Sequence, residues 1–166
     1  MKELVGIAEQ VAARLRELAR LAAEYQASEA DRWDGRRPDM PGRAVPFMPP
    51  YVLDEDEDTW LRGRVRFTRF YLGGNGAAHG GAHAVLFDDV MGRLATRAGC
   101  SGVTRTACLT INYRRVIPTD TELRFDCRVD RIDGRKRFVS ARLYDDTGQV
   151  GADCEGLFVL LRPGQQ

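Results

Sequence analysis

One segment of the sequence, Gly74 to Ala95, reads GNGAAHGGAHAVLFDDVMGRLA and places two kinds of reactive group close together. Its paired glycines, Gly80 and Gly81, come just before an apolar run, where a helix is expected to begin. The first turn of a helix exposes unpaired backbone N–H groups, and the helix dipole favours negative charge there. Glycine also lets a ligand approach the backbone closely, so these residues are candidates for binding a developing oxyanion.

Two adjacent aspartates interrupt the apolar run that follows. A buried and unpaired carboxylate costs on the order of several kcal/mol, so each aspartate needs a reason to be there. Asp89 has one, because Arg93 lies four residues further along the same helix and can pair with it. Asp88 has only apolar neighbours at helical spacing, namely Ala84, Val85 and Met91. The spacing therefore singles out Asp88 as the candidate reactive carboxylate.

The apolar run predicts a helix over residues 81–98 that is apolar nearly all round. Such a helix must be enclosed, and the sequence around it offers strands that can do so. Alternating apolar and polar residues predict strands over residues 60–72, 104–117, 121–132, 136–145 and 149–161. Short turn-like connectors such as IPTD and DGRK favour an antiparallel meander. We expect an α+β fold in which a curved antiparallel sheet wraps a long central helix.

The first 50 residues are predicted to form a separate part of the chain. Apolar positions three and four apart predict an amphipathic helix over residues 3–27, and residues 27–50 form a connector rich in proline and glycine. We therefore expect residues 1–50 to hold an N-terminal helix and connector, and residues 51–166 to form the main domain. The acidic run DEDED, residues 54–58, is interpreted as a solvated loop.

Composition and charge argue against several classes of protein. The net charge is +1 with no cluster of lysine and arginine, so we expect no nucleic-acid partner. No apolar stretch reaches the roughly 18 residues of a membrane span, and the charged N-terminus does not read as a secretory signal. The four cysteines include no C-x-x-C pair and are interpreted as reduced thiols of a cytoplasmic protein. G-x-S-x-G and P-loop motifs are absent, and no βαβ unit follows the glycines as in a Rossmann fold.

The only two histidines, His79 and His83, lie four residues apart, a spacing that can bind zinc on one helix face. No glutamate follows His79 as in H-E-x-x-H, and no third ligand is evident, so we expect neither a metal nor another cofactor. His79 is expected to brace the loop around the oxyanion site. His83 is expected to line the first helical turn or the substrate pocket.

Two stretches, HGGAHAVLFDD and TACLTINYRRVIP, together resemble the PaaI-like acyl-CoA thioesterases of the hotdog fold. The shared features are an H-G-G motif, an acid nine residues after its histidine, and a T-A-x-L-x-I-x-Y strand that ends in a basic residue and proline. The resemblance covers roughly residues 60–160. It implies hydrolysis of the thioester of an acyl-CoA to a free acid and CoA.

The resemblance also implies roles for individual residues. The N–H of Gly80 would polarise the thioester carbonyl, and Asp88 would act as general base or nucleophile. A hydroxyl on the following strand, Thr106 with Thr104 as its competitor, would orient water. The residues expected to contact the substrate around the H-G-G motif are Asn75, Gly81 and His83.

Arg114 and Arg115, beside Pro118, have two interpretations. Guanidinium groups bind phosphate oxygens bidentately, so the two residues are candidates for binding the phosphates of coenzyme A. Exposed arginines are also common at strand ends, where they need no ligand. Both interpretations stay open at the level of the sequence.

The spacing of the candidate groups adds a requirement of its own. Gly80 and Asp88 are eight residues apart, which is about 12 Å along one helix, so one carbonyl cannot touch both. The reaction centre must then combine Gly80 of one subunit with Asp88 of another, which predicts a homodimer or a tetramer that contains such dimers. The hotdog family agrees with this, because its sheets join edge to edge.

Other functions stay open beside acyl-CoA hydrolysis. The chain could act on acyl chains bound to a carrier protein, or it could be a non-catalytic acyl-CoA-binding module. A hotdog dehydratase is disfavoured, because its His–Asp hydratase motif is not found. The sequence separates neither the general-base route from the covalent route nor acyl groups of different length or aromaticity.

Overall fold

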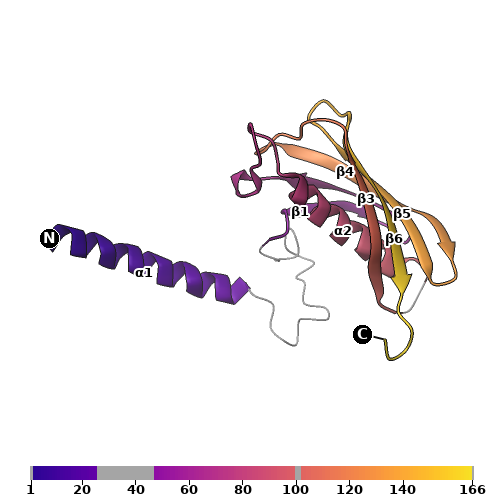
Figure 1. Ribbon diagram of the computed structural model, residues 1–166, viewed down its shortest axis with the longest axis horizontal. Helices are drawn as coiled ribbons and strands as arrows, with labels where there is room; N and C mark the ends of the chain where they lie inside the picture. The colour runs from indigo at the N-terminus through magenta and orange to yellow at the C-terminus, as the bar shows by residue number, and fades with distance from the viewer. Residues whose placement is uncertain (1, 26–46, 100–101, 166) are drawn as a thin grey trace. The chain divides into compact units, whose positions relative to one another are not determined.

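The computed structural model of the chain describes residues 2–25, 47–99 and 102–165 (Figure 1). The chain divides into two compact units, Met1–Phe47 and Met48–Gln166. The second unit contains every strand of the described residues and the helix that carries the candidate residues. It is therefore the unit in which a functional site has to be sought.

The first unit contains α1 (Lys2–Tyr25), the N-terminal helix that the periodicity predicts. Val11, Leu15 and Leu18, which repeat at helical spacing along it, are exposed. The predicted connector falls largely on residues 26–46, which lie outside the described residues. No helix in the described part of the chain is long and apolar enough to cross a membrane.

Six antiparallel strands form a single sheet in the second unit, and a helix lies along one face of it (Figure 1). The sheet has the order β1-β2-β4-β5-β6-β3, so β1 and β3 are its edges. The predicted central helix wrapped by a curved antiparallel sheet is confirmed. The elements of this unit are β1 (Tyr51–Asp56), β2 (Trp60–Arg66), a short 3-10 helix (Arg69–Tyr71), α2 (Gly80–Arg97), β3 (Thr104–Tyr113), β4 (Glu122–Asp133), β5 (Lys136–Tyr144) and β6 (Val150–Leu160).

The strand order differs from the simple meander that the short connectors favoured. β3 pairs with β6 and not with β4, and β2 pairs with β4. After β3, the backbone N–H groups of Arg114 and Arg115 bind the Gly151 carbonyl, and Ala77 pairs with Pro118. These bonds hold the segment after β3 against the start of β6 and the loop before α2. A short connector can therefore serve as a crossing link as well as a hairpin.

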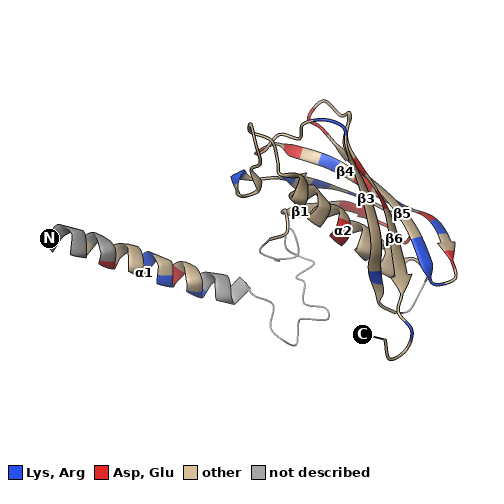
Figure 2. Cartoon of the chain, viewed as in Figure 1, with Lys and Arg blue, Asp and Glu red and all other residues tan. Residues whose placement is uncertain are grey.

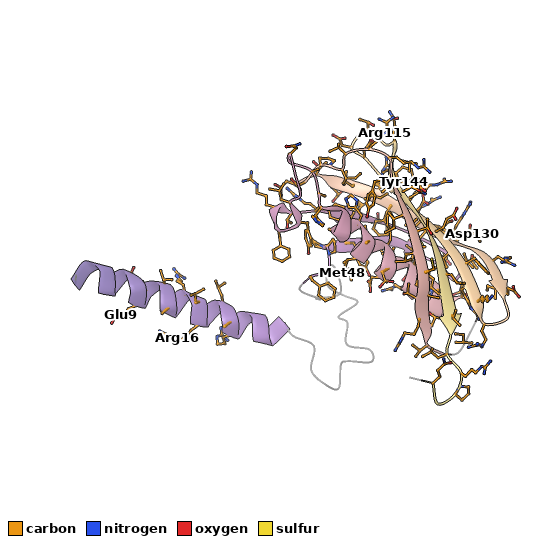
Figure 3. All side chains as sticks on the ribbon, in the orientation of Figure 1. Glu9, Arg16, Met48, Arg115, Asp130 and Tyr144 are labelled. Atoms are coloured by element: carbon orange, nitrogen blue, oxygen red, sulfur yellow. The ribbon has the colours of Figure 1, made fainter. Side chains whose placement is uncertain are left out.

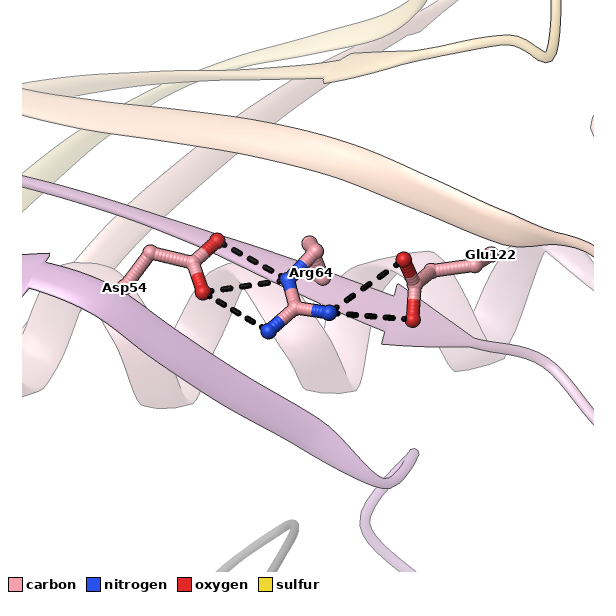
Figure 4. A network of polar contacts seen from close by, with 3 residues as sticks. All are labelled: Asp54, Arg64 and Glu122. Atoms are coloured by element: carbon pink, nitrogen blue, oxygen red, sulfur yellow. Dashed lines mark hydrogen bonds and ion pairs between the residues drawn. The ribbon is translucent and has the colours of Figure 1, made fainter.

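The interpretation of the acidic run as a solvated loop is wrong, because its first residues belong to β1. The side chain of Arg64 on β2 lies between Asp54 on β1 and Glu122 on β4 and binds both carboxylates (Figure 4). Asp56, at the end of β1, binds Arg93 of α2 at 2.5 Å. Arginines on the neighbouring strand and helix thus allow an acidic segment to pair as an edge strand.

The helix α2 is enclosed by the sheet, as its apolar sequence requires. It contacts β3, β4, β5 and β6, and burying each large side chain contributes about 1.5–3 kcal/mol. Figure 2 accordingly shows α2 as mostly uncharged, with acidic residues interrupting it. Its large, fully buried side chains are Leu86, Phe87, Val90, Met91 and Leu94.

The chain between β2 and α2 is a structured loop, where the sequence predicted that the strand would continue. At the tip of a hairpin in this loop, Asn75 (φ 55°) and Gly76 (φ 77°) both adopt the left-handed conformation. The N–H of Ala77 donates to the carbonyl of Gly74 at 3.1 Å. This is the pattern of a type I′ turn, for which Asn-Gly is the preferred sequence. The turn returns the chain to the start of α2.

We predict that Gly76→Ala destabilises the domain by about 1–2 kcal/mol, because alanine is strained in the left-handed conformation. Gly74→Ala is the matched control: an added Cβ meets nothing within 4 Å at either position, and only Gly76 has a positive φ. The control should change the free energy of unfolding by less than about 0.5 kcal/mol. Urea unfolding followed by circular dichroism measures both variants. Equal effects of the two substitutions would contradict the assigned turn.

Candidate active site

The first turn of α2 leaves one backbone donor open. His79 caps the helix, because its Nδ1 accepts the N–H of Gly81 at 2.9 Å and its carbonyl accepts the N–H of Ala82 at 2.9 Å. The N–H of Gly80 has no hydrogen-bond partner within the described parts of the chain. A free donor at a helix N-terminus lies in positive potential, which suits an oxygen that gains negative charge. His79 thus braces the turn, and Gly80 is its open donor.

Tyr113 covers the same turn from β3. Its hydroxyl donates to the Gly80 carbonyl at 2.9 Å, and its ring lies so near that a Cβ added to Gly80 would be 3.3 Å away. The sequence motif places Tyr113 at the end of a strand and does not indicate its contact with Gly80, which only the structure shows. The signal that could identify it is strand parity, which places Tyr113 on the face shared by Leu109 and Ile111, toward the helix.

The carboxylate of Asp88 and the hydroxyl of Thr106 meet on the exposed side of α2. The Thr106 hydroxyl donates to Asp88 at 2.7 Å, and both residues are exposed. Its competitor, Thr104, is buried and shares a hydrogen bond of 2.7 Å with Thr96. A β-bulge at Ala107 lets Thr106 face the helix together with the apolar positions further along β3, because it inserts one extra residue. The geometry therefore brings Thr106, and not Thr104, to the acid.

The neighbouring Asp89 has a structural partner. Its carboxylate accepts the hydroxyl of Tyr51 at 2.6 Å, in a contact that is partly buried between α2 and β1. Arg93, the partner that helical spacing suggested for Asp89, forms an ion pair with Asp56. The two aspartates thus face opposite edges of the sheet, with Asp89 toward β1 and Asp88 toward β3.

His83 lies in the core beside the first turn of α2. Only 3% of it is exposed, and its ring lies 5.0 Å from the ring of Phe67 and 5.7 Å from that of Tyr113. Neither ring nitrogen has a hydrogen-bond partner among the described residues. Burial, helped by the nearby His79, lowers the pKa of His83 to about 4, so the ring is neutral near pH 7. His83 packs on Tyr113, whose ring in turn lies against Gly80 in the first turn. Substrate contact by His83 stays a prediction.

Asn75 and Gly81 flank the capping residue His79. Asn75 is exposed at the tip of the type I′ turn, which accounts for its residue type. Gly81 is exposed as well, but its N–H is bound by His79. Substrate contact by either residue stays a prediction. Within the described residues, no group of three or more His, Cys, Asp or Glu side chains is arranged to hold a metal ion.

Arg114 and Arg115 differ in how firmly they are already paired. Arg114 binds Asp153, which also accepts the Asn112 amide at 2.9 Å, and the nearby guanidinium lowers the pKa of Asp153 below its ordinary value. Arg115 lies at an end of the sheet (Figure 3), with its guanidinium 4.0 Å from Asp145. Both side chains are about half exposed, 56% for Arg114 and 51% for Arg115. Because its ion pair is the longer one, Arg115 is the less firmly held of the two guanidinium groups.

Gly80 and Asp88 belong to one helix, and the eight residues between them correspond to about 12 Å. Each has its own partner on β3, Tyr113 at the end of that strand and Thr106 near its start. β3 is an edge of the sheet. Each chain thus carries two pairs of candidate residues along one edge, which we call the donor half-site (Gly80 and Tyr113) and the acid half-site (Asp88 and Thr106).

Comparison with known proteins agrees with this fold. The family model of the thioesterase superfamily matches residues 75–152, which include both half-sites. A crystal structure of a thioesterase superfamily protein is similar with a TM-score of 0.71 and 31% sequence identity, over 92% of this chain and 78% of that one. A hypothetical thioesterase with coenzyme A from Streptococcus pneumoniae TIGR4 has a TM-score of 0.61 and 20% identity, over 70% of this chain and 88% of that one. At that identity the second likeness concerns the fold alone.

A curated relative supports the same family. Acyl-coenzyme A thioesterase THEM4 of Xenopus laevis is 35% identical over 89 residues, which are 53% of this chain and 39% of that protein. The match therefore spans about two fifths of the length of that relative. The six-stranded antiparallel sheet around α2 is the hotdog fold that the sequence resemblance implies. From the family model and the similar crystal structure together, this chain belongs to the thioesterase superfamily.

Proposed function

We propose that this chain is a PaaI-like acyl-CoA thioesterase whose reaction centres are each built by two copies. The observation that carries the proposal is that the donor and acid half-sites lie about 12 Å apart on one rigid helix. A relative supports the substrate class, since THEM4 of Xenopus laevis is named an acyl-coenzyme A thioesterase. A carbonyl held by Gly80 therefore needs the Asp88 of a second copy.

The edge of β3 offers a way to join the half-sites. An edge strand presents unpaired N–H and C=O groups, and a second copy can pair with it antiparallel about a two-fold axis. With the axis near Thr110, Thr106 of one copy would lie opposite Tyr113 of the other, because the bulge at Ala107 leaves both residues three register positions from that point. Asp88 would then face the partner's Gly80. We propose this homodimer, and a tetramer that contains two such dimers stays a prediction.

In such a centre the thioester carbonyl oxygen accepts the Gly80 N–H of one copy. Asp88 of the other copy takes a proton from water, which Thr106 orients, and the water oxygen attacks the carbonyl carbon. Negative charge collects on the former carbonyl oxygen beside Gly80 until the C–S bond breaks and CoA leaves with the proton as a thiol. In the covalent alternative, Asp88 attacks the carbon itself and water hydrolyses the resulting anhydride. A single turnover in oxygen-18 water identifies the covalent route when label enters Asp88, which happens when water attacks the aspartyl carbonyl of the anhydride.

Coenzyme A release is the direct test of the function. Steady-state release of free CoA from a panel of acyl-CoAs should be observed, whereas a non-catalytic binding module would bind the panel without releasing CoA. Faster hydrolysis of the same acyl group on a carrier protein would favour a carrier-protein thioesterase.

We place the protein in the cytoplasm, since the free thiols of the buried Cys127 and Cys154 suit a reducing compartment.

We predict that Asp88→Asn lowers turnover by two or more orders of magnitude while the fold and assembly persist, because the variant loses its base or nucleophile and keeps its shape. Asp89→Asn is the matched control on the adjacent position, since Asp89 faces Tyr51 and not β3. It should keep turnover within a few-fold of wild type. Steady-state kinetics with circular dichroism and light scattering measures both variants. Turnover that survives Asp88→Asn, or falls equally in both, would reject Asp88 as the acid.

We predict that two inactive variants, Gly80→Pro and Asp88→Asn, restore activity when they form mixed dimers. Proline removes the donor N–H, and it is tolerated at a first helical position after the extended backbone of His79 (ψ 133°). A Cβ at this position would lie 3.3 Å from Tyr113, which must then shift by a few tenths of an ångström. A mixed dimer has one centre with both groups and one with neither, so random exchange should restore about one quarter of wild-type activity.

Subunit exchange in this experiment is verified by native mass spectrometry of differently tagged chains. If mixed dimers form from two folded variants and no activity returns, the reaction centre lies within a single chain. Mixing each variant with itself is the control that should stay inactive.

We predict that Arg115→Gln raises KM for acyl-CoA about tenfold, because a guanidinium–phosphate contact contributes about 1.5 kcal/mol or more. The same acyl group on pantetheine, which lacks the nucleotide phosphates, should show no change in KM. Arg114→Gln is the comparison, since Asp153 already holds that guanidinium. An equal rise of KM for both substrates would show that Arg115 acts on the protein structure and not on phosphate.

A further inference from the structure

Both polar groups of the peptide between Gly80 and Gly81 are bound by side chains. The hydroxyl of Tyr113 donates to its carbonyl at 2.9 Å, and Nδ1 of His79 accepts its N–H at 2.9 Å. The first N–H groups of a helix ordinarily lack protein partners, and helix ends fray. Here two side chains fix the peptide that adjoins the open Gly80 N–H. The orientation of the Gly80 N–H is therefore set by the side chains of Tyr113 and His79, neither of which lies within α2.

Tyr113 is itself held on three sides, although 54% of it is exposed. Its ring lies against Gly80 and packs at 38° on the buried ring of His83, which in turn packs on Phe67. Directly after it, the N–H of Arg114 donates to the carbonyl of Gly151 at 2.8 Å. The hydroxyl that reaches Gly80 is thus carried by a side chain whose ring and backbone are both fixed.

We infer that Tyr113 is a positioning residue of the reaction centre: its hydroxyl holds the Gly80–Gly81 peptide so that the Gly80 N–H points at the thioester carbonyl. This inference rests on the proposed function and adds a residue that acts through Gly80. A donor aimed at an oxyanion contributes most when the charge has developed, because the bond is stronger in the transition state than in the bound substrate. A Gly80 N–H that is no longer held in this orientation therefore lowers kcat more than it changes KM.

Tyr113→Phe is the test, because it keeps the ring contacts with Gly80 and His83 and removes only the hydroxyl. It should lower kcat about tenfold with KM within about twofold of wild type, since removing an oxyanion donor outright costs about 100-fold or more. Tyr71→Phe is the matched control: the Tyr71 hydroxyl also donates to a backbone carbonyl, but to that of Met48 at 2.7 Å and not to one of α2. The substitution keeps the Tyr71 carbonyl that accepts the His79 N–H. It should leave kcat within about twofold. An unchanged kcat in Tyr113→Phe, a rise in KM alone, or an equal fall in Tyr71→Phe would overturn the inference.

A second readout does not depend on turnover. Amide hydrogen exchange of Gly81 in the ligand-free protein should be about tenfold faster in Tyr113→Phe, because the released carbonyl frees the peptide that His79 otherwise holds. It should be unchanged in Tyr71→Phe. Unchanged exchange in Tyr113→Phe overturns the inference even in an active enzyme. A wild-type protein that releases no CoA, yet shows faster exchange in Tyr113→Phe, would reject the proposed function and still support the hold of Tyr113 on Gly80.

Discussion

The rise of one α-helix is the constraint on which the rest of this structure depends. A helix advances about 1.5 Å per residue, so the donor at the start of α2 and the carboxylate eight residues later cannot serve one carbonyl from the same chain. Both groups are anchored to a single edge strand, Gly80 through Tyr113 and Asp88 through Thr106. In the proposed reaction centre, a rigid helix beside an edge strand thus holds two incomplete half-sites, and a second copy related by two-fold symmetry would complete both.

The fold supplies the rigidity that this arrangement needs. α2 is held by fully buried side chains along its whole length, so its two ends cannot move independently. The two aspartates in the middle of α2 have different environments. Asp89 is used to tie the helix to β1 through Tyr51, whereas Asp88 is exposed at the other edge with a single hydroxyl donor. An exposed carboxylate avoids most of the desolvation cost in the single chain. In the proposed dimer, that cost would arise only where the two copies meet.

The sequence identifies the parts of the site that depend on local periodicity. The glycine pair, the apolar run and the neighbours of Asp88 specify the helix, its N-terminus and the unusual acid, because all three follow from contacts within one element. Long-range pairing is harder to predict from local signals. The placement of β3 beside β6 rests on a ladder that runs from the Thr104–Leu160 pair to the Tyr113–Ala152 pair, and no short connector reveals this pairing.

The same limitation explains the other differences between sequence and structure. The acidic residues of β1 form a strand only because Arg64 and Arg93 approach them from other elements. The choice of Thr106 over Thr104 depends on which turn of α2 each hydroxyl meets, since Thr104 bonds Thr96 and Thr106 bonds Asp88. The contact of Tyr113 with Gly80 joins a strand end to a helix start. Each of these features is a tertiary contact, so propensity and spacing along the chain do not reveal it.

The most direct measurement of the central claim is a crystal structure of the Asp88→Asn variant with an unhydrolysed acyl-CoA bound. The two-copy account predicts that the thioester carbonyl oxygen lies within about 3 Å of the Gly80 nitrogen of one copy. The carbonyl carbon should lie within about 3.5 Å of the side chain at position 88 of the other copy, or of a water bound to it. A thioester that contacts Gly80 and position 88 of the same chain, or that is bound far from both, would contradict the account.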